Sequence, residues 1–261
     1  MESLPNDKYI IFLDVDGTVF DGTDVPQKTG EGIDRARANG HKVFINSGRA
    51  HCVIPSYILN KVSHDGIVGG MGTAITVGTK LIYSARMEKD TVEFLLRFGQ
   101  THGYFTIAES IDKLVIMNGR QVLDQKTFVN TTDEFFEKYS DMTVTKITYW
   151  NTVLPKEEID YLKKRVGNVY VLPDYVEIPA KDCNKATAIK RVCEHYGAEI
   201  RQTIAMGDSE NDFDMIKFAG VGVAMGNADE KIKSIADFIT TDCSEGGVAD
   251  ALDALIFKKN A

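Results

Sequence analysis

The chain has 261 residues, of which 43% are hydrophobic and 26% are charged, and its formal net charge at pH 7 is −8. This composition is typical of a globular protein with a large core arranged as one or two domains. Net negative charge argues against a nucleic-acid partner, because phosphate backbones are bound through dense Lys and Arg. A membrane partner is not expected either, since no apolar stretch approaches the roughly 18 residues that span a bilayer.

The four cysteines, Cys52, Cys183, Cys193 and Cys243, show no Cys-x-x-Cys spacing, so free thiols in a reducing compartment are expected. The first residues lack a basic region followed by an apolar core, and we expect no signal peptide. These features predict a cytoplasmic location.

Residues 9–13, Tyr-Ile-Ile-Phe-Leu, run directly into Asp14-Val15-Asp16-Gly17-Thr18. Such a continuous apolar run predicts a strand covered on both faces, as in a parallel sheet. Buried carboxylates are costly without a partner, and ligands bind at the carboxyl ends of parallel strands. Either a hard cation such as Mg²⁺ holds Asp14 and Asp16 together, or the strand simply ends in an Asp-Gly turn.

The following residues alternate between helix and strand patterns, as in a parallel sheet. A helix is expected from just after Pro26 to Gly40, and another at 52–59. Strands are expected at 41–45 and near 66–68, and a hairpin at 73–77 and 80–83. From residue 182 the alternation resumes, with helices at 185–196, 213–218, 229–235 and 248–256 and strands at 202–206, 221–225 and 238–239.

Between these two parts, about residues 86–180, the pattern changes. Helices are expected at 88–98, 133–139 and 155–166, and short strands at 104–108, 113–117, 143–150, 169–172 and 175–178. Clustered antiparallel-looking strands with a few helices favour an α+β domain. We therefore predict a Rossmann-like α/β core of residues 1–84 and 182–261, interrupted by an inserted α+β domain of residues 85–181.

Four polar clusters stand at strand ends or helix starts: Asp14 with Asp16, Ser47-Gly48-Arg49, Lys185, and Gly207-Asp208-Ser209-Glu210-Asn211-Asp212. Each alone is weak, since Asp-Gly turns are common and a Lys at a helix start is usually solvated. Together they supply a nucleophile, metal ligands, an oxygen-binding hydroxyl and a fixed cation. Phosphoryl transfer uses these groups.

In order and spacing, these clusters resemble the four motifs of the haloacid dehalogenase-like hydrolase superfamily. The match extends to its Cof-type phosphatases, which carry an α/β cap of type IIB between the second and third motifs. It includes residues 222–228 and 246–249. The resemblance implies a Rossmann-like core with the inserted cap as a lid over the active site.

The resemblance also implies a role for each residue. Asp14 would be the nucleophile that forms an aspartyl-phosphate. Asp16 would be the general acid and then the base, and its backbone carbonyl would bind Mg²⁺. Asp208 would be the other carboxylate on the metal, and Asp212 would orient the site. To donate a proton near neutral pH, Asp16 must be protonated, and we expect burial and nearby carboxylates to favour that form.

The remaining implied roles concern the phosphate. Ser47 and the Gly48 N–H would bind a phosphoryl oxygen, Lys185 would neutralise phosphate and nucleophile, and Asn211 would contact phosphate or water. Serine stands at 47 where the family often has threonine, which leaves the hydroxyl in place. Arg49 either meets a charged substrate group or is structural.

Two further stretches invite a functional interpretation. Residues 220–226 nearly spell a dinucleotide-binding fingerprint, but the third glycine is one residue late, so an apolar strand flanked by glycines is favoured. Tyr149 and Trp150 either touch the substrate or pack in a sheet, where aromatic residues are common.

The sequence therefore predicts a Mg²⁺-dependent phosphatase of small phosphorylated metabolites, above all sugar phosphates. Three alternatives remain open: a phosphotransferase that uses the same intermediate, a phospho-acceptor signalling module, and a non-catalytic sugar-phosphate sensor.

Overall fold

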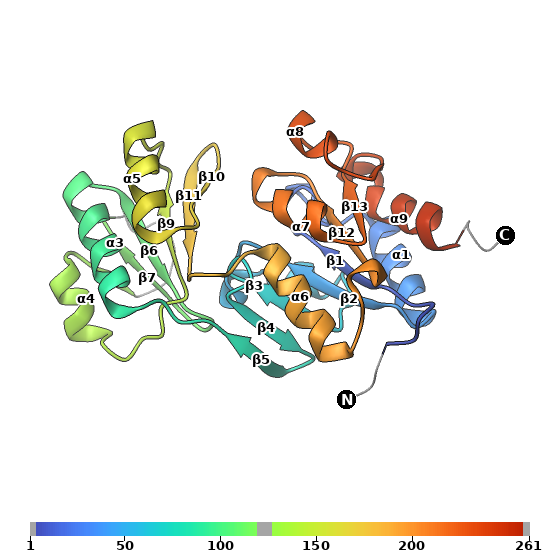
Figure 1. The fold of residues 1–261 in the computed structure, drawn as a ribbon, viewed down its shortest axis with the longest axis horizontal. Coiled ribbons are helices and arrows are strands. Elements are labelled where there is room, and N and C mark those ends of the chain that lie inside the picture. The colour runs from blue at the N-terminus through green and yellow to red at the C-terminus, as the bar shows by residue number, and fades with distance from the viewer. Residues whose placement is uncertain (1–3, 119–126, 258–261) are drawn as a thin grey trace.

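The computed structural model describes residues 4–118 and 127–257. These residues form two lobes, each built on its own β-sheet, and the chain passes between them after Ser84 and after Pro179 (Figure 1). The larger lobe combines both ends of the chain, and the smaller lobe is formed by its middle part. This arrangement confirms the predicted fold class, an α/β core with an inserted α+β cap.

In the larger lobe, eight strands of the described chain form a sheet in the order β14-β13-β12-β1-β2-β3-β4-β5. The strands are β1 (Ile10–Leu13), β2 (Lys42–Asn46), β3 (Gly66–Gly69), β4 (Ala74–Val77), β5 (Lys80–Ser84), β12 (Thr203–Gly207), β13 (Val221–Ala224) and β14 (Phe238–Ile239). All pair in parallel except β4 and β5, which form an antiparallel hairpin at one edge. Every residue of β1 is buried, as its apolar run predicts. Since β1 pairs with both β2 and β12, the residues that follow these strands meet at one edge.

The helices of this lobe are α1 (Gln27–Ala38), α2 (Ser56–Leu59), α6 (Lys185–Tyr196), α7 (Phe213–Phe218), α8 (Glu230–Lys233) and α9 (Gly247–Leu252). Helix α1 packs against α9, and α6 packs against α7. Gly32 allows the first contact to be close, because a Cβ there would lie 2.7 Å from the Cβ of Ala249.

The single helix predicted at 52–59 is wrong. The chain forms a 3₁₀ turn over His51–Val53, becomes extended at Ile54 and Pro55, and then forms α2. A proline disfavours the helical conformation of the residue before it, and Ile54 accordingly has a ψ of 117°. The other predicted elements are present with their ends shifted by a few residues.

The cap sheet has the strand order β10-β11-β9-β6-β7-β8. Its elements are α3 (Lys89–His102), β6 (Phe105–Glu109), β7 (Leu114–Met117), β8 (Phe128–Val129), α4 (Thr132–Lys138), β9 (Lys146–Trp150), α5 (Lys156–Val166), β10 (Tyr170–Val171) and β11 (Tyr175–Pro179). The pairs are antiparallel except β7 with β8. Strand β8, which has two residues, was not predicted from the sequence.

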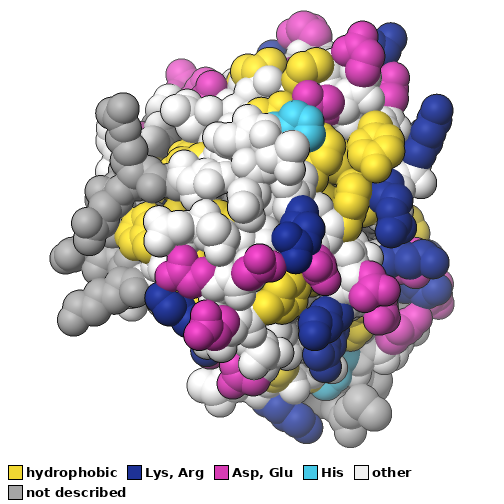
Figure 2. Space-filling view, turned by 90° about the vertical axis from the view of Figure 1, so that its left-hand side faces the viewer, with side chains coloured by type: hydrophobic (Ala, Val, Ile, Leu, Met, Phe, Trp, Pro, Cys, Tyr) yellow, Lys and Arg dark blue, Asp and Glu magenta, His cyan; other side chains and the backbone are white. Residues whose placement is uncertain are grey.

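The helices α3, α4 and α5 cover the face of the cap sheet that points away from the core lobe (Figure 1). On the outer surface of the cap, basic and acidic side chains are interspersed (Figure 2). The opposite face of the sheet is turned toward the core lobe. There Ile107, Leu114 and Ile116 form a buried apolar cluster with Ala50, and Val53 of the core packs against it.

All four cysteines are free thiols, with Cys52 exposed and the other three buried. Within residues 4–118 and 127–257, no helix combines the length and apolar character that a membrane crossing requires.

Candidate active site

Asp14 is the first residue after β1, and its side chain is buried. Its backbone N–H donates to the Met206 carbonyl of β12 at 3.1 Å, which extends the parallel pairing to the end of the strand. Its Oδ1 accepts a hydrogen bond from Lys185 Nζ at 2.6 Å. The carboxylate is therefore held at the edge of the sheet by an ammonium group.

Lys185 is the first residue of α6 and has no exposed surface. The helix begins there because Asn184 Oδ1 accepts the Thr187 N–H at 2.7 Å, while Thr187 Oγ1 accepts the Asn184 N–H at 3.0 Å. The ammonium group also donates to Asp212 Oδ1 at 2.6 Å. A solvated lysine, the simpler interpretation of the sequence, is thereby excluded.

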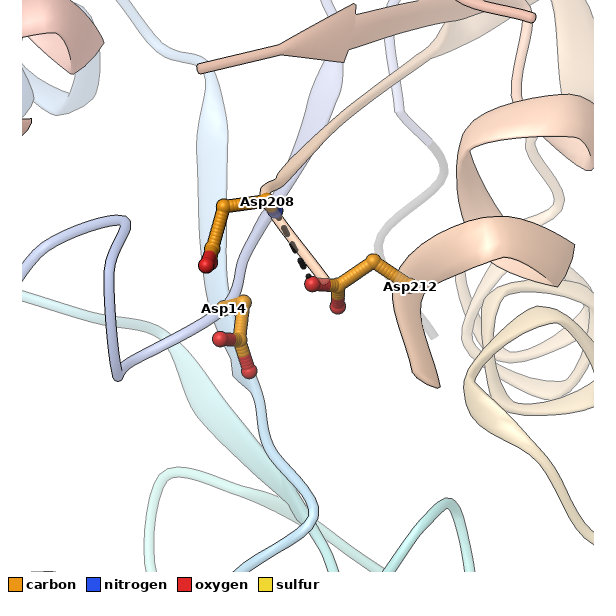
Figure 3. A group of neighbouring side chains, drawn as sticks. All are labelled: Asp14, Asp208 and Asp212. Atoms are coloured by element: carbon orange, nitrogen blue, oxygen red, sulfur yellow. Dashed lines mark hydrogen bonds between the residues drawn. The ribbon is translucent and has the colours of Figure 1, made fainter. Parts of the chain in front are cut away.

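Asp208 and Asp212 join Asp14 in a carboxylate cluster (Figure 3). Asp208 follows β12, and its Oδ1 accepts from Thr18 Oγ1 at 3.1 Å. Asp212 Oδ2 accepts the backbone N–H groups of Asp208 at 3.0 Å and Ser209 at 3.1 Å. One carboxylate oxygen from each of the three Asp residues lies within 4.8 Å of the other two.

The electrostatics of the cluster are dominated by burial and by the proximity of like charges. Burial, followed by the charge of Asp212, raises the pKa of Asp14 well above its usual value. The same two causes raise the pKa of Asp208 to about 7. Burial would lower the pKa of Lys185, but the charges of Asp14 and Asp212 outweigh it and raise that pKa. Lys185 therefore stays charged, and its single positive charge is shared among the carboxylates of the cluster.

A divalent cation fits this site. Three carboxylates share one ammonium group, and carboxylate oxygens are the ligands that hard cations prefer. Both oxygens of Asp212 already accept hydrogen bonds, from Lys185 and from backbone N–H groups. Asp14 and Asp208 are thus the carboxylates better placed to bind a metal.

Asp16 differs from the expectation in its burial, although its charge acts on the nearby Asp14 and Asp208 as expected of neighbouring carboxylates. Its side chain is 51% exposed and forms a bidentate ion pair with Arg49. Arg49 Nε donates to Oδ2 at 2.7 Å, and Arg49 Nη2 donates to Oδ1 at 2.8 Å. The burial expected around Asp16 is therefore absent in this conformation, where both carboxylate oxygens face a guanidinium. The partner of Arg49 here is a protein carboxylate.

Ser47 and Gly48 follow β2, next to the end of β1. The Ser47 hydroxyl is buried and accepts the Arg49 N–H at 3.1 Å, which closes a tight turn. Asn211, from the loop after β12, accepts a hydrogen bond from Lys185 Nζ on its Oδ1 at 3.0 Å. A Cβ at Gly48 would lie 3.2 Å from Asn211 Nδ2, so the loops after β2 and β12 meet at this point.

The cap contributes charged residues that the sequence analysis missed: Glu109, Lys146 and Glu177, all buried. They lie on β6, β9 and β11, on the sheet face turned toward the core. The only signal was the alternation of polar and apolar residues along β9 and β11. Such a pattern usually means that the polar face of the strand is exposed to solvent. It therefore gives no sign that the polar face is buried against another lobe.

The two aromatic residues of β9 take different roles. Tyr149 is fully buried among the cap helices, and its hydroxyl donates to the Leu95 carbonyl at 2.9 Å. Trp150 points to the opposite face, is 44% exposed, and stacks on Tyr175 with ring centroids 5.0 Å apart. Packing in the cap core thus explains Tyr149, whereas the ring of Trp150 is partly exposed to solvent.

The glycine-flanked stretch at 220–226 contains β13, a largely buried parallel strand, as the late third glycine predicts. The residue after it, Asn227, donates from Nδ2 to the Gly17 carbonyl at 2.8 Å. The loop after β13 therefore supports the turn that carries Asp16.

Comparison with known proteins agrees with this geometry. The sequence profile of the haloacid dehalogenase-like hydrolases matches residues 11–252. YkrA of Bacillus subtilis is 29% identical over 95% of this chain and 98% of its own length. YitU of the same organism, a 5-amino-6-(5-phospho-D-ribitylamino)uracil phosphatase, is 27% identical over 95% of this chain and 97% of its own length.

Among solved structures, the HAD subclass IIB sugar phosphatase BT4131 is similar with a TM-score of 0.83 and 25% identity. The similarity covers 94% of this chain and 98% of BT4131, so it includes the cap as well as the core.

Proposed function

Since the chain belongs to the haloacid dehalogenase-like hydrolases and is a phosphatase, we propose that it hydrolyses small phosphorylated metabolites, above all sugar phosphates, with Mg²⁺ and through an aspartyl-phosphate. The observation that carries this proposal is the buried contact between Asp14 and Lys185 beside Asp208. This contact supports the roles of Asp14 as nucleophile, Lys185 as fixed cation and Asp208 as metal ligand, close together at the carboxyl end of β1.

In the first step, an oxygen of Asp14 attacks phosphorus and the bond from phosphorus to the ester oxygen breaks. Lys185, bonded to Asp14 Oδ1, counters the negative charge of the nucleophile and of the phosphoryl group. Asp16 gives its proton to the leaving oxygen, so the alcohol departs neutral.

In the second step, Asp16 removes a proton from water, and the water oxygen attacks phosphorus. The bond from phosphorus to Asp14 then breaks, which releases inorganic phosphate and restores the carboxylate. For the first step Asp16 must leave its ion pair with Arg49 and take up a proton. We propose that substrate entry separates this pair.

The Ser47 hydroxyl, the Gly48 N–H and Asn211 would bind phosphoryl oxygens, and Asp212 would orient the loop through the N–H groups it accepts. The Mg²⁺ ligands would be Asp14, the backbone carbonyl of Asp16, and Asp208. When bound, Mg²⁺ supplies a Lewis acid that neutralises charge on the phosphoryl oxygens.

The division into a core of residues 1–84 and 182–261 and a cap of residues 85–181 is also part of the proposal. It is supported by two separate sheets and by separate buried clusters in the two lobes. The cap would exclude water and contact the alcohol part of the substrate. A cytoplasmic location remains a proposal that rests on composition alone.

Two relatives favour a polyhydroxylated substrate. BT4131 is described as a sugar phosphatase, and YitU is named for a phosphorylated ribityl chain attached to a uracil ring. The exposed ring of Trp150 on the core-facing side of the cap suits a sugar ring or a planar heterocycle, since aromatic residues offer a large apolar contact surface.

The proposal is tested by a screen of phosphorylated sugars, polyols and ribityl-uracils with Mg²⁺, ranked by kcat/KM. Asp14→Asn should abolish phosphate release, and Asp16→Asn should accumulate phosphoenzyme, visible by mass spectrometry. Near-normal turnover by Asp14→Asn would refute the nucleophile.

Adding free sugars to the same assay separates hydrolysis from phosphotransfer, because a phosphotransferase would form new sugar phosphates. A phosphoenzyme that persists for minutes without turnover would favour the phospho-acceptor module. Saturable sugar-phosphate binding without phosphoenzyme or phosphate release would favour the sensor.

A further inference from the structure

The contact between cap and core changes character along the cap sheet. Over Ala50 it is apolar, with Ile107, Leu114 and Ile116 packed together there. Where the cap meets Gly48, the same face carries buried charges. Apolar contacts would suffice to close the cap, and desolvating charges is costly, so these charged residues require another explanation.

Lys146 lies at the centre of this charged group and is 2% exposed. Its Nζ donates a hydrogen bond to the Gly48 carbonyl oxygen at 2.6 Å and another to Glu177. The same atom lies 3.2 Å from Glu109 Oε1. The charges of Glu109 and Glu177 outweigh burial and raise the pKa of Lys146, so it remains an ammonium ion. Lys146 therefore joins the cap directly to the proposed phosphate-binding turn.

Glu177 makes the second connection. Asn211 Nδ2 donates to Glu177 Oε2 at 3.4 Å, and a Cβ at Gly48 would lie 2.9 Å from Glu177 Oε1. A side chain at this position would require the Glu177 carboxylate to shift. Because Lys146 balances its charge, Glu177 can lie beside a turn that binds phosphate.

An unbroken series of polar contacts thus leads from the cap to the proposed nucleophile. Glu177 accepts from the NH₂ group of Asn211, whose Oδ1 faces Lys185 at 3.0 Å. Lys185 in turn donates to Asp14 at 2.6 Å. An amide has a donor end and an acceptor end. Glu177 can only accept and Lys185 can only donate, so Glu177 reinforces the orientation in which the Asn211 oxygen faces the lysine.

We propose that Glu177 and Lys146 are positioning residues through which cap closure sets the catalytic site. Glu177 holds the Asn211 NH₂ group and so fixes the Asn211 oxygen against Lys185, and Lys146 anchors the Gly48 carbonyl. With the cap open, both contacts are absent, and the Asn211 amide is held through its Oδ1 by Lys185 and Ser209 but not through its NH₂ group. The enzyme is therefore fully competent only when water is excluded. This inference rests on the proposed function.

The test compares Glu177→Met, Glu177→Gln and Lys146→Met with the wild type. Removing a residue that positions another functional residue typically lowers activity by about 10–100-fold. We expect kcat of Glu177→Met to fall in that range, with little change in KM. Glu177→Gln keeps one acceptor oxygen and should retain more activity than Glu177→Met. Glu158→Gln is the matched control: this cap carboxylate accepts from Tyr104 on the far side of the sheet, and kcat should not change.

A double-variant cycle distinguishes positioning from a structural role. If Glu177 acts through Asn211, then Glu177→Met combined with Asn211→Ala should be no slower than Asn211→Ala alone. Losses that multiply, or a wild-type kcat for Glu177→Met, would overturn the inference.

Hydrogen exchange gives a readout that does not need activity. In Glu177→Met the backbone amides of residues 47–49 and 209–212 should exchange faster, and in Glu158→Gln they should not. Unchanged exchange in Glu177→Met would also overturn the inference. A wild-type protein that hydrolyses no phosphate ester with Mg²⁺ would instead refute the proposed function, and the exchange result would still test the contacts.

Discussion

Arg49 holds Asp16 by two hydrogen bonds of 2.7 and 2.8 Å, at the rim of the site whose centre is Asp14. The hydrogen bond to Asp16 is also the main reason that the pKa of Arg49 is raised. The two carboxylates after β1 therefore have opposite surroundings. Asp14 is buried beside Lys185, and Asp16 is solvated and paired with a guanidinium. In this conformation both oxygens of the proposed general acid accept hydrogen bonds from Arg49, so the pair must separate before Asp16 can reach a leaving group.

Replacing Arg49 by Met should raise kcat. Without the guanidinium, Asp16 reaches the leaving oxygen without first breaking an ion pair. Exposed pairs contribute up to about 1 kcal/mol, which corresponds to an increase of up to about fivefold in rate. Arg201→Met, which removes an exposed pair with Glu199, is the control and should leave kcat unchanged. An unchanged kcat in Arg49→Met would show that the pair does not hold Asp16 away from the leaving oxygen.

Replacing Lys185 by Met should destabilise the protein in a pH-dependent way. The substitution leaves Asp14 and Asp212 buried without their cation, a loss of about 3–5 kcal/mol in the free energy of unfolding at neutral pH. At about pH 5 the loss should be smaller, because buried carboxylates with raised pKa values take up protons and need no partner.

Urea unfolding at the two pH values measures this difference, and kcat should fall by on the order of 10²–10³-fold. Lys190→Met on the exposed side of the same helix is the matched control, with little expected change in either quantity. Equal losses for Lys185→Met at both pH values would contradict the assigned charges.

Much of the core could be predicted because its signals are local. The apolar run before Asp14 marks a buried strand, and parallel pairing of β1 with β2 and β12 brings the following residues together. Asn184 and Thr187 mark the start of α6 at Lys185. In these places, local pattern and long-range pairing favour the same structure.

The features that escaped prediction depend on contacts between distant segments. The pairing of Asp16 with Arg49 joins loops 33 residues apart, and neither residue signals it alone. Likewise, Lys146 and Glu177 lie on alternating strands whose polar face is normally solvated. Their burial follows only from the placement of the cap on the core.

Gly17→Ala should disturb Asp208, whereas Gly22→Ala should not. Both glycines have positive φ, 79° and 94°, so both alanine variants should lose about 1–2 kcal/mol of stability through backbone strain. Only at Gly17 would the new Cβ lie 2.4 Å from Asp208 Oδ2, while at Gly22 it meets nothing within 4 Å. The Mg²⁺ concentration for half-maximal activity should therefore rise in Gly17→Ala alone. Equal Mg²⁺ dependence in both variants would argue against Asp208 as a metal ligand.

The stabilising effect of Mg²⁺ should increase with pH. The pKa of Asp208 is about 7 in the fold, against 3.8 for an unperturbed group, so the folded state binds more protons than the unfolded state between these values. The metal-free protein should therefore lose stability, by up to a few kcal/mol, as the pH rises from about 4 to about 7.

Mg²⁺ competes with the proton for the carboxylate, and it binds the ionised form that predominates above pH 7. Thermal unfolding with and without Mg²⁺ should show a Tm increase that is small at about pH 5.5 and larger at about pH 8. In Asp208→Asn the carboxyl group is replaced by an amide that does not ionise. The Tm increase caused by Mg²⁺ should therefore be small at both pH values in this variant. A Tm increase that is independent of pH in the wild type would mean that Asp208 does not bind the metal, because a ligand with this pKa must lose its proton first.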